Sequence, residues 1–152
     1  MSASDTPVVA TDAPAKPPNR VQVSWDGDFR FRGRREDGGP SITLDGKGIA
    51  GPGPVDSLLI ALASCTGIDV TDILAKRRTP VESLDIGVIG DRAPSIPARL
   101  TRIHLTYDLV GVAVERVHAE RAIELAVTKY CSVRDSLDPA TPITWTLVLN
   151  GA

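Results

Sequence analysis

Three short segments near the start of the chain alternate apolar and polar residues, a pattern that predicts β-strands. They cover residues 21–25, 29–32 and 41–45. The turn residues 26–28, Asp-Gly-Asp, join the first two segments and predict a hairpin. Residues 46–54 hold too much glycine and proline for regular structure, so we expect a loop that approaches a site or a subunit boundary.

A long apolar segment follows and predicts a helix from Pro54 to about residues 76–78. Pro54 suits the first helical position because its missing N–H is not needed there, and Asp56 in the first turn interacts favourably with the helix dipole. Residues 58–62 are apolar on every side of this helix, so we expect it to be buried on all sides. Pro80 prevents its continuation.

The second half of the chain repeats the two patterns. Residues 83–90 and 99–110 alternate and predict an antiparallel pair of strands. Apolar residues at helical spacing predict a helix over residues 114–130, a short turn or helix follows, and residues 143–149 predict a last strand. The expected order is β-β-β-α-β-β-α-β, which is an α+β fold.

Length and composition indicate one domain. The 152 residues suit a single core. Residues 1–19 are rich in Ala, Pro, Asp, Ser and Thr without helical or strand periodicity, which predicts a disordered tail. We expect the folded domain over residues 20–152.

Charge and hydropathy exclude several classes of partner. The 17 basic and 19 acidic residues leave a net charge of −2, which favours neither nucleic acid nor anionic lipid. No stretch approaches the roughly 20 apolar residues that span a bilayer, and the start lacks the pattern of a signal peptide. We therefore expect a cytoplasmic protein with a small neutral partner. A disulfide in that compartment is more often transient and catalytic than structural.

The two cysteines are the main candidates for chemistry. Cys65 lies within the apolar helix, where it is either a small core residue or a nucleophile that needs a nearby cation, for which the arginines of residues 29–32 are candidates. Cys131 lies at a helix end before a polar segment, where a thiol can move. The pair suits a peroxidatic thiol that becomes a sulfenic acid and a resolving thiol that converts it to a disulfide. The alternative is two unrelated buried cysteines.

Other combinations are weaker. His104 and His118 could join the cysteines around zinc, but none of the short ligand spacings of zinc sites occurs. Cys65 with His104 would form an acyl-transfer dyad without a third residue to orient it. Residues 46–54 lack the Gly-Lys-Ser/Thr ending of a phosphate loop. We therefore expect no metal and no cofactor.

Two motifs give the chain a resemblance to a known family. Residues 51–66, GPGPVDSLLIALASCT, resemble the central helix of the OsmC/Ohr family, and residues 129–133, KYCSV, resemble its second cysteine motif. Residues 24–27 and 102–105 agree as well, so the match covers about residues 20–150.

This resemblance implies an OsmC-like fold, in which two curved sheets wrap a pair of central helices in an intertwined homodimer. It also implies reduction of organic hydroperoxides, with Cys65 peroxidatic and Cys131 resolving. A dithiol reductant, with a lipoyl-linked one as the candidate, would reset the disulfide.

The resemblance is to the broader OsmC-like branch, and the acidic residue of the expected site differs from that of the classical hydroperoxide resistance enzymes. Those enzymes carry a glutamate directly after the helix-starting proline, where this chain has Val55, and its own acidic residue, Asp56, comes one place later. Asp56 either orients an arginine or caps its helix. The family's activating arginine is one of four, of which we prefer Arg32; the others are Arg30, Arg34 and Arg35.

The difference at the acidic position keeps a second function open. A ligand-binding or stress-associated protein on the same scaffold would keep both cysteines without turning over a substrate, because fold does not fix function.

Overall fold

The computed structural model describes residues 13–152. Its elements are β1 (Val21–Trp25), β2 (Arg30–Arg35), β3 (Ile42–Asp45), α1 (Pro54–Lys76), β4 (Ser83–Arg92), β5 (Leu100–Val110), α2 (Arg116–Leu125), the π-helical turn η1 (Ala126–Tyr130), α3 (Ser132–Asp135) and β6 (Ile143–Leu149). The predicted tail, residues 1–19, lies largely outside the described residues, and residues 13–20 have no regular structure.

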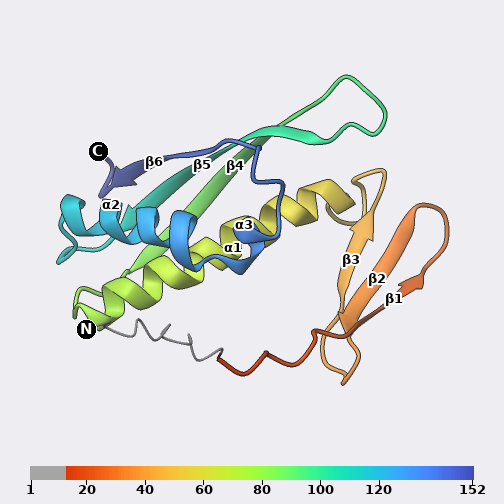
Figure 1. The fold of residues 1–152 in the computed structure, drawn as a ribbon, viewed down its shortest axis with the longest axis horizontal. Coiled ribbons are helices and arrows are strands. Elements are labelled where there is room, and N and C mark those ends of the chain that lie inside the picture. Colours follow the sequence, from red (N-terminus) through yellow and green to blue (C-terminus); the bar gives the residue numbers. More distant parts are fainter. Residues whose placement is uncertain (1–12) are drawn as a thin grey trace, which may run out of the picture.

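The strands form two separate sheets of three (Figure 1). In the first, β1, β2 and β3 pair antiparallel in chain order. In the second, β4 and β5 pair antiparallel, whereas β5 and β6 run parallel, since α2 and η1 lie between them in the chain. The predicted α+β class and the order of elements are confirmed, although α2 begins at Arg116 rather than Val114 and its continuation is a π-helical turn.

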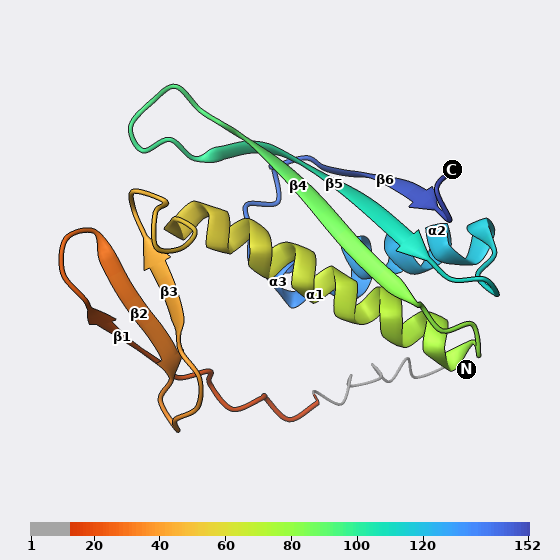
Figure 2. The same cartoon turned by 180° about the vertical axis from the view of Figure 1, so that it is seen from behind.

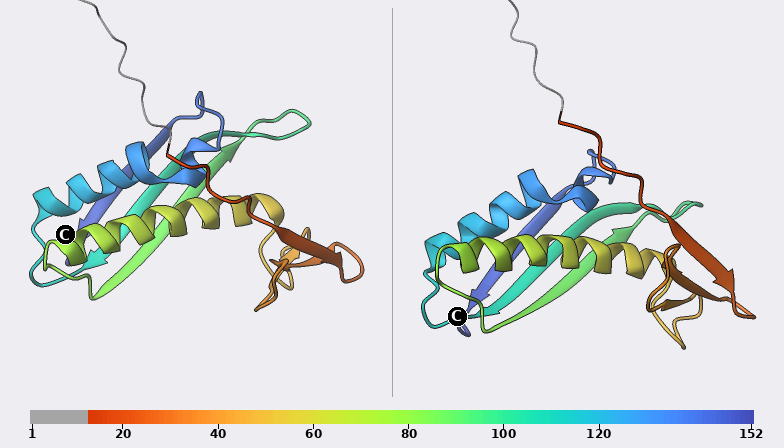
Figure 3. Two further views of the ribbon diagram at one scale, coloured as in Figure 1. Left: turned by 60° about the horizontal axis from the view of Figure 1, so that its bottom comes forward. Right: turned by 90° about the horizontal axis from the view of Figure 1, so that it is seen from below.

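The core lies between the second sheet and the helices. Helices α1 and α2 cover the same face of the β4–β5–β6 sheet, side by side, as Figure 3 shows from two directions. Alternate residues of β5 point into this layer and are fully buried, as the alternation predicts. Its members from β5 are Ile103, Leu105, Tyr107 and Leu109.

Helix α1 is buried on one side only within the single chain, which agrees with the expectation that its second face is covered by a partner chain and would be exposed in a monomer. One side packs on the sheet and α2, but Ile60 and Ile68 on another side are 54% and 68% exposed. By length and composition alone α1 could also cross a membrane, which the sequence expectation did not allow for. Core helices of globular proteins meet the same criterion, and α1 packs here against β4 and α2.

The first sheet stands off the N-terminal end of α1 (Figure 2), and almost all residues of β1 and β2 are exposed, on both of its faces. Antiparallel partners share a face, and the register places Val23, Gly33 and Ile42 in one row and Trp25, Phe31 and Leu44 in the next. Trp25 is 68% exposed and Ile42 63%. The chain thus carries two apolar surfaces that it does not cover itself, on this sheet and on α1.

Candidate functional site

The structure brings the two cysteines together. Cys65 lies in the middle of α1 and is half-buried, whereas Cys131 follows η1 and is buried, with 4% exposure. Both are free thiols, and Cys65 packs against the core cluster that contains Cys131. Residues far apart in the sequence therefore lie in one part of the core.

Cys131 lies at an interruption between two helical segments. Its N–H donates to the carbonyl of Ala126 at 3.0 Å, which closes the π-helical turn. Its sulfur accepts a hydrogen bond from the N–H of Arg134 at 3.2 Å and so caps α3. Such π-turns are frequent at functional sites. The cysteine thus occupies a backbone junction, as the sequence predicts.

The surroundings of Cys131 favour its neutral form. Burial raises the pKa of the Cys131 thiol to about 11, and the neighbouring Cys65 thiol acts in the same direction. The backbone N–H of Arg134 opposes this rise in pKa because it stabilises the thiolate. At neutral pH Cys131 is accordingly a neutral thiol.

Three residues near the pair were missed by the sequence analysis as site candidates. The hydroxyl of Tyr107, on β5, donates to the hydroxyl oxygen of Thr66 at 2.7 Å, and both residues are fully buried. Asp69 lies one helical turn after Cys65, and its buried Oδ2 has no hydrogen-bond partner among the described residues. Each of these polar residues interrupts an apolar pattern in the sequence, and this interruption could have marked them as site candidates.

Asp56 caps its helix. Its carboxylate oxygen Oδ2 accepts a hydrogen bond from the N–H of Gly53 at 2.9 Å, at the N-terminus of α1. Among the described residues, no arginine forms an ion pair with Asp56. Of the two roles that the sequence left open, the geometry of the single chain thus shows the cap.

The four candidate arginines lie on the first sheet and do not meet Cys65 of their own chain. The register places Arg30, Arg32 and Arg34 on its polar face and Arg35 on the apolar face, opposite Val21. Arg32 forms an ion pair with Asp26 at 3.3 Å, and both side chains are about half exposed. None of these four arginines forms a hydrogen bond with Cys65 among the described residues.

A buried carboxylate fixes the loop between β3 and α1. Asp45 accepts hydrogen bonds from the backbone N–H groups of Lys47 at 2.9 Å and Ala50 at 2.9 Å. These hydrogen bonds, first that from Ala50 and then that from Lys47, lower the pKa of the Asp45 carboxyl. The glycine-rich loop is thus held in one conformation that leads into the first turn of α1.

The histidines lie away from the sulfurs. His104 faces outward on β5, where its Nδ1 lies 2.7 Å from the Thr144 hydroxyl and its Nε2 3.0 Å from that of Thr146. His118 lies on α2 beside Glu115 at 3.9 Å. Within residues 13–152, no group of three or more His, Cys, Asp or Glu side chains could hold a metal ion.

Two hollows adjoin the elements that carry the cysteines. One, of about 460 Å³, lies between α1 and β4 and is lined mainly by apolar residues, among them Leu59, Ile60 and Val88. The other, of about 340 Å³, reaches Cys131 and is bordered by Lys129 and Arg134. Only the second of these hollows is lined by a cysteine, whereas the first borders the residues that precede Cys65 in α1.

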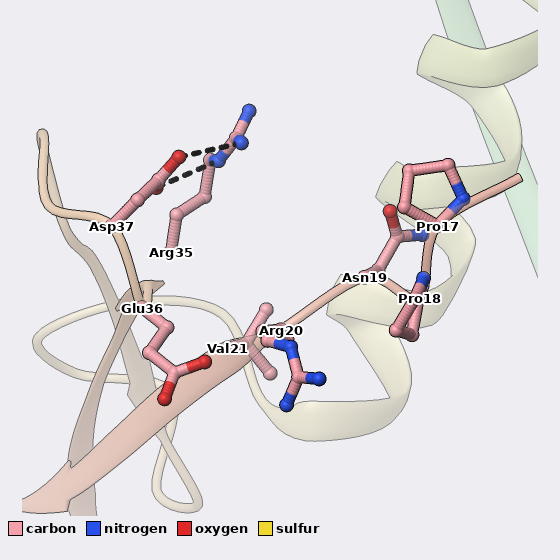
Figure 4. Close-up of a pocket in the computed structure, with 8 residues that line it drawn as sticks. All are labelled: Pro17, Pro18, Asn19, Arg20, Val21, Arg35, Glu36 and Asp37. Carbon is pink, nitrogen blue, oxygen red and sulfur yellow. Dashed lines mark hydrogen bonds and ion pairs between the residues drawn. The ribbon is translucent and has the colours of Figure 1, made fainter.

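A larger hollow, of about 710 Å³, lies elsewhere, where β1 begins and β2 ends. Figure 4 shows Arg35 and Asp37 bound to each other there, while Pro17 and Pro18 line the opposite side. It contains neither cysteine, so its size does not make it the site of thiol chemistry.

Comparison with known proteins identifies the family. The family model described as OsmC-like protein matches residues 45–146, which include both cysteines. The chain belongs to the OsmC family. Protein YhfA of Escherichia coli, strain K12, is 32% identical over 126 residues, which are 82% of this chain and 93% of that protein. The resemblance seen in the sequence motifs is thus confirmed.

Solved structures support the same OsmC assignment. The crystal structure of a hypothetical protein from Aquifex aeolicus VF5 matches with a TM-score of 0.76 and 30% identity, covering 89% of this chain and 99% of that one. The organic hydroperoxide resistance protein OhrB of Bacillus subtilis matches with a TM-score of 0.59 and 13% identity, covering 86% of this chain and 98% of that one. The second likeness shows a shared fold.

Proposed function

We propose that this protein is a cytoplasmic thiol peroxidase that reduces organic hydroperoxides, with Cys65 as the peroxidatic and Cys131 as the resolving cysteine. The packing of Cys65 against the core cluster that contains Cys131 is the observation that carries the proposal. The names of the hydroperoxide resistance proteins that share the fold are consistent with it.

In the first step the Cys65 thiolate attacks the O–O bond of the hydroperoxide. A sulfur–oxygen bond forms, the O–O bond breaks, and the departing alkoxide takes a proton to become an alcohol. Cys65 is thereby oxidised to a sulfenic acid. The apolar lining of the hollow between α1 and β4 suits the alkyl part of such a substrate.

In the second step Cys131 attacks the sulfenic acid of Cys65. A disulfide forms, the sulfur–oxygen bond breaks, and the hydroxide leaves as water with the proton of Cys131. A dithiol, for which a lipoyl-linked group is the candidate, then reduces the disulfide. The hollow beside Cys131 gives it a path to the sulfur.

We propose that the protein acts as a homodimer. The apolar face of the first sheet and the exposed side of α1 are complementary in character, and covering large apolar surfaces is the main gain in subunit association. If the first sheet of one chain lies on α1 of the other, each covers what its own chain leaves exposed. An arginine of the partner's sheet then comes near Cys65.

Arg32 remains the arginine that we propose for activating Cys65 across the dimer. Its guanidinium would stabilise the thiolate and the charge that develops on the departing oxygen. In the single chain Arg32 pairs with Asp26, whose side chain is about half exposed. Arg32 could leave this exposed ion pair to bind the Cys65 thiolate of the partner chain. Arg35 lies on the apolar face of the sheet, which would meet the partner's α1 in this dimer, so it is the competing candidate.

The decisive experiment measures hydroperoxide consumption with a dithiol reductant. We expect turnover by the wild type, none above background with Cys65→Ser, and loss of sustained turnover with Cys131→Ser, which should accumulate a sulfenic acid. A wild type no faster than Cys65→Ser would refute the peroxidase and leave the non-catalytic binding protein as the better account.

Paired arginine variants then test the activating group. Arg32→Ala should slow the first oxidation about a hundredfold or more, because a donor to developing charge is lost, while Arg35→Ala should change it little. The reverse result would assign activation to the apolar face of the sheet.

A further inference from the structure

The hollow of about 340 Å³ beside Cys131 has a positively charged lining. Its charged residues are two cations, Lys129 and Arg134, and one anion, Asp135. Within residues 13–152, none of these three side chains takes part in an ion pair. The positive charge of the lining is therefore not neutralised by neighbouring carboxylates, although the chain as a whole carries a net charge of −2.

One short segment, residues 129–135, carries both the sulfur and these charges. Lys129 belongs to η1, which ends before Cys131, and its Nζ lies over the ring of Tyr130, 5.5 Å from the centroid. Arg134 belongs to α3, is partly buried, and donates its backbone N–H to the Cys131 sulfur at 3.2 Å. A molecule that reaches this sulfur through the hollow therefore passes both cations.

We propose that this hollow binds the reductant of the protein and selects a thiol that carries a carboxylate. This inference rests on the proposed function, in which a dithiol resets the disulfide. The carboxylate of the incoming molecule would pair with Arg134 and Lys129 while its sulfur approaches Cys131. An amide-linked lipoyl group has no such carboxylate, so the inference narrows the choice of dithiol to a free acid.

The reductive step begins at the Cys131 sulfur. A thiolate of the reductant attacks this sulfur and forms a mixed disulfide, while the bond to Cys65 breaks and Cys65 leaves as a thiolate that takes up a proton. The second thiol of the reductant then attacks the reductant's own sulfur in the mixed disulfide. The oxidised reductant leaves as a cyclic disulfide, and Cys131 is released as a thiol.

Dihydrolipoate and dihydrolipoamide test the selection, because they differ only in a carboxylate against a neutral amide. The full-length protein is first oxidised to the Cys65–Cys131 disulfide with diamide and freed of oxidant. We expect dihydrolipoate to reduce it about fivefold faster at low ionic strength and at nearly the same rate as the amide in concentrated salt. Arg134→Gln should remove most of this preference, and Asp135→Asn should increase it. Arg121→Gln, an exposed position of α2 outside the hollow, is the matched control and should keep it.

The ratio of the two reduction rates isolates the effect of charge. Both reductants attack the same disulfide in the same variant, so a change in cysteine pKa or in local packing affects both rates alike and cancels from the ratio. The inference is overturned if the two reductants act equally fast on the wild type at low ionic strength. It is also overturned if Arg134→Gln keeps the same ratio as Arg121→Gln.

A second measurement separates the inference from the proposed function. In Cys65→Ser, Cys131 is the remaining thiol, and it is reacted with dithiodipropionate, hydroxyethyl disulfide and cystamine, which are anionic, neutral and cationic. We expect the anion to react fastest and the cation slowest, and Arg134→Gln to abolish this order. The order in a protein that consumes no hydroperoxide would support the basic site and refute the peroxidase. Its absence in a protein that does turn over hydroperoxide would refute the inference alone.

Discussion

The two sheets follow the same alternating pattern and reach different outcomes. In the β4–β5–β6 sheet, the apolar side chains of β5 lie under α1 and α2 and are fully buried. In the β1–β2–β3 sheet, equivalent apolar residues such as Val23 and Ile42 are more than half exposed. Alternation therefore indicates which side of a strand is apolar, but not whether the same chain buries that side.

The largest expected effect comes from placing a charge on the apolar face of the β1–β2–β3 sheet. Val23→Asp should weaken dimerisation about a thousandfold, or about 4 kcal/mol, because the carboxylate would be buried without a partner in the proposed dimer. Sedimentation velocity over a concentration series measures the change. Ser24→Asp, one residue later and on the polar face, is the matched control and should dimerise normally. Equal behaviour of the two variants would exclude this face from the interface.

A pair of isoleucines compares the two sheets directly. Ile103→Ala in the covered sheet should lower the free energy of unfolding by about 3 kcal/mol, because Ile103 is fully buried. Ile42→Ala should cost much less at low protein concentration, where the face is bare, and more as the protein dimerises. Urea unfolding at several concentrations tests this. A concentration-independent loss of equal size at both positions would show that the first sheet is already covered within the chain.

Much of this fold could be predicted from sequence because its signals are local. The prolines at positions 54 and 80 bracket α1, and the alternation in residues 100–110 marks the inner face of β5. The exposure of α1 in the single chain followed from the family resemblance and not from the local pattern, because a helix apolar on all sides indicates burial without indicating which chain covers it. The parallel pairing of β5 with β6 likewise depends on how the segment between them crosses the sheet.

The site was predictable only in part, for the same reason. The cysteine motifs identified Cys65 and Cys131, but their proximity depends on the packing of α1 against η1, which no local pattern encodes. Asp56 was recognisable as a capping residue from its place in the first turn. Tyr107 was not recognised because tyrosine fits the apolar pattern of a strand. The hydrogen bond from its hydroxyl to Thr66 depends on the packing of β5 against α1.

The smallest expected effect is a loss of stability at alkaline pH, which arises from Cys131 in the core beside the β4–β5–β6 sheet. Burial raises the pKa of Cys131 from 9.0 to about 11, so the folded chain keeps this proton at pH values where the unfolded chain has lost it. The associated stability is complete below about pH 9 and is lost as the pH rises towards 11. Under reducing conditions, the wild type should therefore lose on the order of 2 kcal/mol more than Cys131→Ser across that range. Ile42→Ala, in the uncovered sheet, should keep the wild-type pH dependence, whereas identical curves for wild type and Cys131→Ser would mean that the thiol is not buried as described.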